Sequence, residues 1–375
     1  MPNSRALLAL AVLAMAAAAS AEQAPITGQR AFAAKPFQTS VVATFDRPWA
    51  MAFLPDGRML VTEKAGHMLL LSADGQRRTE VSGIPAVNPA GQGALGEVVP
   101  HPDFARNHLV YFSYSSPGAP NGIVLARGKL AGDVDDARLE GVTTLYRGFP
   151  LRGGGSQYAG RIAFSPDGYL FFSIGERQKA TPAQDSAGVL GKIVRLTPDG
   201  KPAQGNPLVG QGFDPAVWSY GHRNPLGLAF DLQGRLWENE MGPRGGDEVN
   251  LILPGRNYGW PIVSNGDNYD GSLIPDHPTR PDLEAPKVSW NPSISPSSLL
   301  VYSGKIFPKW RGKALIGALS GRSLILIELG QEDAREQARY DMTNRIRAVQ
   351  QAPDGAVYVL EDGDDARLLR LTPKH

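Results

Sequence analysis

Three arginines in two short motifs are the residues of this chain best suited to hold a charged ligand. Arg345 and Arg347 are spaced two apart, so in a strand both guanidinium groups point to the same side. Arg223 and Asn224 lie together in the motif YGHRNP. Guanidinium groups bind carboxylates through paired hydrogen bonds, so convergence of these arginines predicts a site for a polyanion. The alternative is pairing with nearby acids, namely Glu240, Asp247 and Glu248.

The segment MGPRGGDEVN, residues 241–250, offers ligands of a second kind. Its glycines allow backbone carbonyls to turn toward a hard cation, and oxygen ligands are those that calcium prefers. Gly-rich turns are also common in repeated all-β folds, so this segment alone does not separate a cation site from an ordinary turn.

Several other chemistries are disfavoured. The chain has no GxGxxG before a helix, no Walker loop and no HExxH, and its six histidines are scattered, so nucleotide and zinc chemistry are not predicted. It has no cysteine, which excludes disulfides and thiolate metal sites. With 38 Lys and Arg against 37 Asp and Glu, the net charge is +1. No global field therefore attracts nucleic acid or an anionic membrane, and a small ligand is the expected partner.

Six copies of one strand and turn unit position these residues. Each copy is an apolar strand, a turn often written Pro-Asp-Gly, and a second apolar strand, followed by a third. Pro presets φ at the first central position of the turn, while Asp and Gly tolerate the left-handed conformations that close a hairpin. The copies span residues 49–64, 95–115, 160–177, 225–242, 299–319 and 346–362.

This repetition predicts an all-β fold, a six-bladed β-propeller. Repeated short strands and turns are typical of radial closure, whereas a β-sandwich does not require the same unit six times. We expect a single propeller domain over residues 41–375, preceded by an N-terminal extension over 22–40. The two longest insertions, 131–157 and 257–296, are expected on one rim, where loops carry function.

The first 21 residues are typical of a secretory signal peptide. Arg5 precedes an apolar run from Ala6 to Ala19, and small residues at Ala19 and Ala21 come before the expected cleavage ahead of Glu22. The run is shorter than the ~20 residues of a membrane-spanning helix, which disfavours a membrane anchor. We expect the mature protein to be periplasmic or secreted, without a membrane span.

Two aromatic residues, Tyr269 and Trp290, lie within the long insertion. Their rings present flat faces of the kind that pack against a sugar, so we expect both to contact substrate. Packing at the rim is the alternative for Trp290.

The arginine motifs belong to a longer series of segments that resembles the soluble pyrroloquinoline quinone (PQQ) dependent sugar dehydrogenases, the glucose/sorbosone and aldose sugar dehydrogenase family. The segments are RPWAMAFLPDGRMLVTEK, GQGALGEVVPHPDF, GRIAFSPDGYLFFSIGER, YGHRNPLGLAF, GPRGGDEVNLILPGRNYGWP and NRIRAV. The resemblance covers nearly the whole mature chain and implies a six-bladed propeller, in agreement with the repeats.

The resemblance implies a PQQ- and calcium-dependent oxidoreductase. Such an enzyme oxidises an aldose sugar by hydride transfer from the anomeric carbon to PQQ and passes electrons to an external acceptor. The residues implied for PQQ are Gln92, Arg223, Asn224, Arg345 and Arg347, with Gln92 also near the sugar. The carbonyls of Gly242 and Pro243 resemble the calcium donors. The three arginines would neutralise the three carboxylates of PQQ.

Three departures from the family pattern bear on activity. Gln157 stands in QYAGR where relatives carry a histidine base, and an amide cannot act as a general base near neutral pH. Ser320 stands where a PQQ-contacting lysine is usual. Arg322, two residues on, is expected to face the same way in a strand and to supply the charge. Met241 is a poor calcium ligand beside Gly242.

Glu176 is the candidate substitute base. It occupies the place of the carboxylate that orients the missing histidine in relatives, and burial near other acids can raise the pKa of a carboxyl group. His222 is the other candidate. Relatives with an intact base carry the same histidine in YGHRN, however, and this favours a structural role.

Three functions therefore compete. The leading one is a PQQ- and calcium-dependent sugar dehydrogenase, weakened by Gln157. The alternative is a propeller that binds PQQ, a sugar or a protein partner without turnover, which Gln157, Ser320 and Met241 together favour. A calcium-dependent lactonase fits less well, because such a site needs several carboxylates and amides around one metal, whereas the expected axis is rich in Arg.

Overall fold

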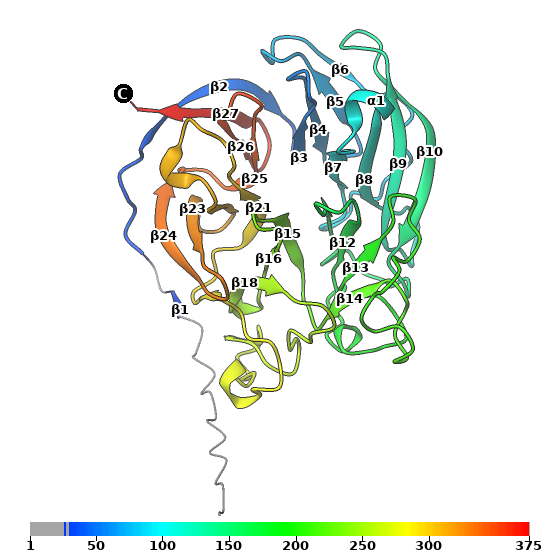
Figure 1. The fold of residues 1–375 in the computed structure, drawn as a ribbon, viewed down its shortest axis with the longest axis vertical. Coiled ribbons are helices and arrows are strands. Elements are labelled where there is room, and N and C mark those ends of the chain that lie inside the picture. The colour runs from blue at the N-terminus through cyan, green and yellow to red at the C-terminus, as the bar shows by residue number, and fades with distance from the viewer. Residues whose placement is uncertain (1–25, 28–29, 375) are drawn as a thin grey trace, which may run out of the picture.

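The fold comes from a computed structural model that describes residues 26–27 and 30–374. Six antiparallel sheets stand as blades around a central axis (Figure 1). This arrangement confirms the predicted all-β, six-bladed propeller. The expected signal peptide and its cleavage position lie outside the described residues. Within the part of the chain that is described, no helix is long and apolar enough to cross a membrane.

Blades 1 to 3 follow one another along the chain, each with its first strand innermost. Blade 1 contains β3 (Pro48–Phe53), β4 (Met59–Glu63), β5 (Met68–Leu71) and β6 (Arg78–Glu80). Blade 2 contains β7 (Leu95–Pro100), α1 (Phe104–Asn107), β8 (Leu109–Ser115), β9 (Ile123–Ala131) and β10 (Arg138–Arg147). Blade 3 contains β11 (Ala159–Phe164), β12 (Leu170–Ile174), β13 (Lys192–Leu196) and β14 (Val217–Tyr220), with a 3-10 turn at Thr181–Ala183.

Blades 4 to 6 complete the ring. Blade 4 contains β15 (Pro225–Phe230), β16 (Leu236–Glu240), β18 (Asp247–Ile252) and β20 (Val288–Trp290), with β1 (Ile26–Thr27) parallel to β20. Blade 5 contains β21 (Pro296–Val301), β22 (Ala314–Ala318), β23 (Ser323–Leu329) and β24 (Ala334–Asp341). Blade 6 contains β25 (Ile346–Gln351), β26 (Val357–Glu361), β27 (Ala366–Pro373) and β2 (Phe37–Phe45). The remaining elements are the ribbon of β17 (Arg244–Gly245) with β19 (Gly266–Asp267), and 3-10 turns at His277–Thr279 and Pro308–Trp310.

The ring is closed by pairing the two ends of the chain. Strand β2 pairs antiparallel with β27, from Phe37 opposite Pro373 to Phe45 opposite Ala366, and Figure 1 shows the blue and red strands side by side. The propeller therefore begins at residue 37. The boundary predicted at residue 41 falls inside β2, because the pairing partner of this strand is remote in sequence.

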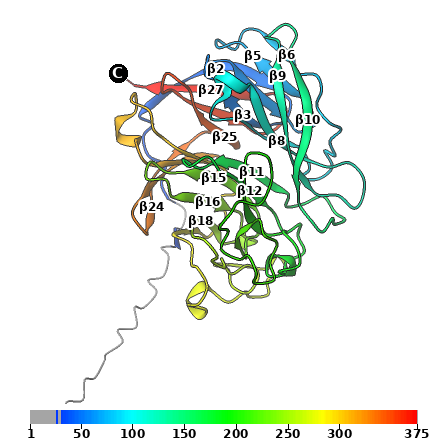
Figure 2. The ribbon, with the colours of Figure 1, turned by 45° about the vertical axis from the view of Figure 1, so that its right-hand side comes forward.

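The two predicted rim insertions contain blade strands. Residues 131–157 include β10, and residues 257–296 include β20, each toward the outer edge of its blade. The rest of the second insertion, drawn in yellow, extends beyond blade 4 in Figures 1 and 2.

A buried polar side chain on the second strand of each of the first four blades binds the next blade. The hydrogen bonds run from Thr62 Oγ1 to the Gly96 carbonyl (2.7 Å), from Ser113 Oγ to Gly160 (2.7 Å), from Ser173 Oγ to Pro225 (3.0 Å) and from Asn239 Nδ2 to Ser298 (2.9 Å). In blade 5 the corresponding position is Gly317, and Ser297 Oγ instead donates to the Ile346 carbonyl at 2.6 Å. These bonds satisfy buried backbone oxygens and fix the orientation of each blade relative to the next.

One side chain on the axis links five blades. Arg161, on β11, is 3% exposed. It pairs through Nη1 with Glu97 Oε2 of blade 2 at 2.7 Å, and its Nε donates to the Leu226 carbonyl of blade 4 at 2.6 Å. Its Nη2 donates to the Ser297 carbonyl of blade 5, and its guanidinium lies 4.1 Å from the ring centroid of Trp49 in blade 1.

We expect Glu97→Gln to lower the free energy of unfolding by about 3–5 kcal/mol, because it leaves the Arg161 charge buried without its partner. Glu328→Gln is the matched control, since Glu328 pairs with Arg335, whose side chain is 73% exposed; its cost should stay below about 1 kcal/mol. Urea unfolding of both variants measures the difference. Equal losses would show that the axial pair contributes no more than a surface pair.

Candidate functional site

The candidate site lies at the end of the axis where the innermost strands begin. The six innermost strands run in the same direction, so the residues that precede them meet at one mouth. Two adjoining cavities of about 440 Å³ and about 640 Å³ lie there. Residues that line both are Gln92, Asn224, Met241 and Ser295. The two cavities therefore form neighbouring compartments of one site.

The first cavity is lined by cations. Arg345 Nε and Arg347 Nη2 pair with the same carboxylate, that of Asp362, at 2.7 and 2.6 Å. Burial alone would raise the pKa of Asp362, but the two guanidinium groups hold it below its usual range. Lys64 lines the cavity and donates to the Gly91 carbonyl at 2.6 Å. Arg47 also lines it and pairs with the exposed Asp364.

The second cavity is lined mainly by amides and hydroxyls. These residues are Gln92, Ser156, Gln157, Gln178, Asn224, Asn291, Ser293, Ser295 and Ser320. Such groups both donate and accept hydrogen bonds. Tyr269, 66% exposed, stands at the edge of the cavity with its ring open to solvent. A neutral polyhydroxylated ligand matches this lining.

Arg223 lies between the second cavity and the Gly-rich segment. It is 5% exposed, and its Nη1 donates to the carbonyls of Gly242 at 2.7 Å and Met241 at 2.9 Å. Its Nη2 lies 3.2 Å from the Tyr269 hydroxyl. No carboxylate forms a salt bridge with Arg223 among the described residues.

The carbonyl of Gly242 is where a calcium ion is expected. A Cβ at residue 242 would lie 2.3 Å from the Gly245 oxygen and 2.4 Å from the Gly246 oxygen, so only glycine allows this close turn. Gly242 and Pro243 both line the second cavity. The Gly242 carbonyl already accepts from Arg223, but a carbonyl oxygen has two lone pairs. One lone pair of this oxygen therefore remains for a hard cation, which would need further oxygen ligands from a bound ligand or water.

Gln157 is part of the cavity wall. It is 4% exposed, its backbone N–H donates to Gln92 Oε1 at 2.6 Å, and its Oε1 accepts from the backbone of Gln178 at 2.9 Å. Its φ is +50°, in the left-handed region that side chains rarely adopt. Gln157 therefore lines the second cavity with its side-chain oxygen already bonded to the backbone of Gln178.

The nearby carboxylates do not supply an obvious base. Glu176 is 1% exposed and lines neither cavity; its Oε2 accepts from the backbone of Lys179 and Ala180. Burial raises the pKa of Glu176. Asp247 lines the second cavity, but its two oxygens accept backbone N–H groups of Gly242 (2.9 Å), Ile294 (2.7 Å) and Ser295 (2.7 Å). Burial, opposed by these bonds, raises the pKa of Asp247 to about 6.

Comparison with known proteins shows the family to which this propeller belongs. A sequence profile described as glucose/sorbosone dehydrogenase matches residues 45–370. The chain belongs to this family. The resemblance drawn from the sequence motifs is confirmed.

Individual relatives of the family cover most of the chain. Aldose sugar dehydrogenase YliI of Escherichia coli (strain K12) is 38% identical over 339 residues, 88% of this chain and 91% of the relative. Quinoprotein glucose dehydrogenase B of Acinetobacter calcoaceticus is 26% identical, over 86% of this chain and 84% of the relative. The PQQ-bound form of aldose sugar dehydrogenase from Streptomyces coelicolor superposes with a TM-score of 0.73 at 31% identity, over 92% of this chain and 100% of that structure.

Two residues expected in the site lie elsewhere. Trp290 is fully buried on β20, and its Nε1 donates to Glu336 Oε2 at 2.7 Å, so the expected stacking on a sugar is wrong. Arg322 is exposed in the turn between β22 and β23, at φ +45°. It lines neither cavity. The expectation that Arg322 replaces the family lysine is wrong, because residues 319–322 form a turn, where side chains two apart do not share a face.

Lys64 and Arg47 are cavity residues that the sequence reasoning missed. Both lie at the ends of the hairpin of β3 and β4 in the segment RPWAMAFLPDGRMLVTEK. Both residues stand at the same strand ends as the arginine motifs, and this position could have indicated that they face the cavity. It becomes visible only when the six blades are set around one axis.

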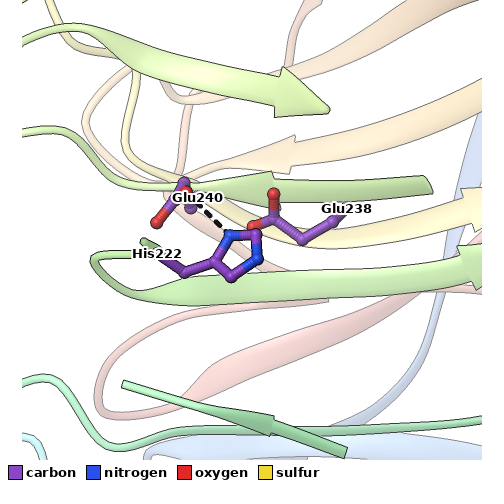
Figure 3. A group of neighbouring side chains, drawn as sticks. All are labelled: His222, Glu238 and Glu240. Carbon is purple, nitrogen blue, oxygen red and sulfur yellow. Dashed lines mark hydrogen bonds and ion pairs between the residues drawn. The ribbon is translucent and has the colours of Figure 1, made fainter. Parts of the chain in front are cut away.

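Behind the Arg223–Asn224 turn lies a buried group that the motif search also missed. His222, Glu238 and Glu240 come together there, as Figure 3 shows. His222 lies 3.3 Å from Glu240 and stacks on Tyr258 with ring centroids 4.6 Å apart. Because His222 is 0% exposed and lines neither cavity, the structural role favoured from the sequence agrees with its position, and it is not placed to act as a base.

A buried lysine holds the loop beside the site. Lys192, on β13, is 0% exposed, and its Nζ donates to the carbonyls of Pro182 (2.8 Å), Leu190 (2.9 Å) and Ala183 (3.3 Å). Burial lowers the pKa of Lys192 from 10.5 to about 7. Between these values the unfolded chain keeps a proton that the native chain releases, so raising the pH favours the native state.

We therefore expect the free energy of unfolding to rise with pH above about 7, by up to about 1.4 kcal/mol per pH unit. Below that pH both states carry the proton, and this contribution is constant. Urea unfolding across the range measures the slope, which should flatten in Lys192→Met and persist in Lys201→Met, a change at an exposed lysine. A slope unaffected by Lys192→Met would contradict the assignment.

Proposed function

We propose that this protein is a PQQ- and calcium-dependent aldose dehydrogenase whose turnover is slowed by Gln157. The observation that carries the proposal is the charge of the site. Arg345 and Arg347 share one aspartate and leave one net positive charge. Lys64 adds one, and the second cavity adds one, since Arg223 and Arg244 line it together with Asp247. Three net positive charges match the three carboxylates of PQQ.

The relatives support the same reading. The Streptomyces coelicolor enzyme is PQQ-bound, and the Acinetobacter calcoaceticus relative is a quinoprotein glucose dehydrogenase. We place PQQ in the cationic cavity with its far edge toward Arg223 and Asn224, and calcium at the carbonyls of Gly242 and Pro243. When bound, PQQ supplies a quinone that accepts a hydride, and calcium supplies Lewis acidity.

The second cavity would take the sugar. Its amides and hydroxyls pair with sugar hydroxyls, and the exposed ring of Tyr269 offers a flat face. Gln92 lines both cavities, so it would contact sugar and cofactor together. Its Oε1 accepts from the backbone of Gln157, and this bond ties the sugar-binding wall to the position of the missing base.

The same wall explains why turnover is expected to be slow. An amide at residue 157 cannot accept the proton of the anomeric hydroxyl. Glu176 lines neither cavity, and Asp247 has both oxygens occupied by backbone donors. Water from the solvent would then have to accept the proton of the anomeric hydroxyl. A propeller that binds PQQ and sugar without turnover is the second candidate function, and this absence of a base in the described cavity lining is the observation that favours it.

Export of the chain and an external electron acceptor also belong to the proposed function. The leader of residues 1–21 would export the chain to the periplasm or outside the cell, and an external acceptor would reoxidise the cofactor. Neither alters the chemistry assigned to the cavities.

The test separates binding from turnover. The mature chain is titrated with PQQ in the presence and absence of calcium, and dye reduction is then measured with a panel of aldoses. Micromolar or tighter PQQ binding with slow, sugar-dependent dye reduction supports the proposal. Binding without any turnover favours the second candidate, and no PQQ binding overturns both.

A further inference from the structure

The cluster of His222, Glu238 and Glu240 has the makings of a metal site. Each residue offers one ligand atom, and these atoms lie within 4.8 Å of one another. Glu238 and Glu240 lie two apart on β16, so their side chains share one side of the strand. His222 comes from the turn before β15, which pairs with β16. All three residues are at most 4% exposed.

Hydrogen bonds orient the histidine and one carboxylate. His222 Nε2 lies 2.9 Å from Ser219 Oγ, and Nδ1 lies 3.3 Å from Glu240 Oε1. Metal-bound histidines commonly have their second nitrogen fixed by such a partner. Because Nδ1 faces an anionic oxygen, this nitrogen either carries a proton or binds a cation.

Orphaned oxygens supply the independent observation. Glu238 Oε1 and Asn250 Oδ1 have no hydrogen-bond partner among the described residues, and both residues are 0% exposed. Asn250 Nδ2 reaches Glu238 Oε2 at 3.0 Å and Glu248 Oε2 at 3.3 Å. An unmet buried oxygen costs about 1–3 kcal/mol, so Glu238 needs a partner.

A proton is the competing partner. Burial, with Glu240 close by, raises the pKa of Glu238 well above its ordinary value. A protonated Glu238 would relieve the charge at this carboxyl. His222 and Glu240 would then keep their contact with each other without a charge at Glu238.

We propose that His222, Glu238 and Glu240 bind one divalent ion of the zinc, manganese or cobalt class. One imidazole nitrogen with two carboxylate oxygens suits these ions, whereas calcium prefers oxygen alone. The two charges of the ion balance the two carboxylates. This site is separate from the carbonyls of Gly242 and Pro243, and the inference does not depend on PQQ.

The ion would hold the turn that presents the cofactor-binding residues. Glu240 Oε2 accepts the backbone N–H groups of Arg223 at 2.5 Å and Asn224 at 2.9 Å. Fixing Glu240 therefore fixes the start of β15. The role is structural, because none of the three ligands lines either cavity.

The experiment uses the full mature chain, treated with chelator, dialysed and titrated with Mn²⁺. We expect one ion per chain, with electron spin-echo modulation from a bound imidazole nitrogen. The nitrogen signal should vanish in His222→Gln, and affinity should fall at least about tenfold in Glu238→Gln. The matched control is His277→Gln, a second buried histidine, next to Glu248, which should keep the signal.

Three results would overturn the inference. They are no stoichiometric ion in the wild-type chain, a bound ion without nitrogen coupling, and nitrogen coupling that survives His222→Gln. The first two need only the wild-type chain, so the inference stays testable even if the variants fail to fold.

Discussion

Gln157→His is expected to raise the rate of PQQ-dependent sugar oxidation by about 100- to 10,000-fold. That is the usual contribution of a well-placed general base. The position is prepared for it, since residue 157 lies in the wall of the second cavity with φ +50°, a conformation in which histidine is several-fold enriched. The gain is measured as kcat/KM for aldoses with PQQ and calcium present.

We expect Glu176 to orient the new imidazole. Glu176 lies between Gly175 and Arg177, and both neighbours approach the backbone of residue 157: a Cβ on Gly175 would meet its carbonyl at 2.1 Å, and the N–H of Arg177 donates to it at 3.3 Å. A carboxylate that holds one imidazole nitrogen makes the other the base. We therefore expect Glu176→Gln to remove most of the gain in a Gln157→His background.

Two controls separate chemistry from binding. Gln178→His places an imidazole at another glutamine of the same cavity and should give no comparable gain. The Gln157→His enzyme should also acquire a pH dependence with an apparent pKa near that of histidine, about 6.5, that the parent lacks. An unchanged kcat/KM at unchanged PQQ affinity would show that the side chain of residue 157 does not limit turnover.

The fold was largely predictable because the information is local and repeated. Each copy contains its own turn and its own alternation of apolar and polar residues, so six hairpins can be predicted from six short segments. The outer strands lack this signature. The sequence therefore predicts insertions where β10 and β20 lie. It also predicts a loop at Trp290, which packs on β20 with Val288 and Trp237 in the core.

The site was predictable only where a motif carried it. Arg345, Arg347 and Asn224, which the motifs indicated, line the first cavity, and their contact with PQQ stays a prediction. Arg322 failed because a strand was assumed where the chain turns, and residues two apart in a turn diverge. Lys64 was missed for another reason. Its importance depends on which strand ends meet at the axis, and this is a property of the closed ring and not of any one repeat.

Lys64→Gln is accordingly expected to weaken PQQ binding by about 10- to 100-fold. An interaction with a charged group is worth about 1.5–3 kcal/mol, and each 1.4 kcal/mol is about tenfold in affinity. Among the described residues the ammonium donates once, to the Gly91 carbonyl at 2.6 Å, which leaves two of its three N–H groups for a carboxylate. Equilibrium titration with PQQ measures the loss without reference to turnover.

The loss of PQQ affinity should depend on the positive charge at residue 64 and not on the presence of lysine in particular. Lys64→Arg is expected to retain most of the affinity, while Lys129→Gln, at an exposed lysine on β9, should leave it unchanged. The salt dependence of PQQ binding should also weaken in Lys64→Gln, because one fewer cation faces the ligand. If Lys64→Gln bound PQQ as tightly as the parent, the net charge of the mouth would be set by the arginines alone. PQQ would then meet two positive charges, with one carboxylate left to solvent.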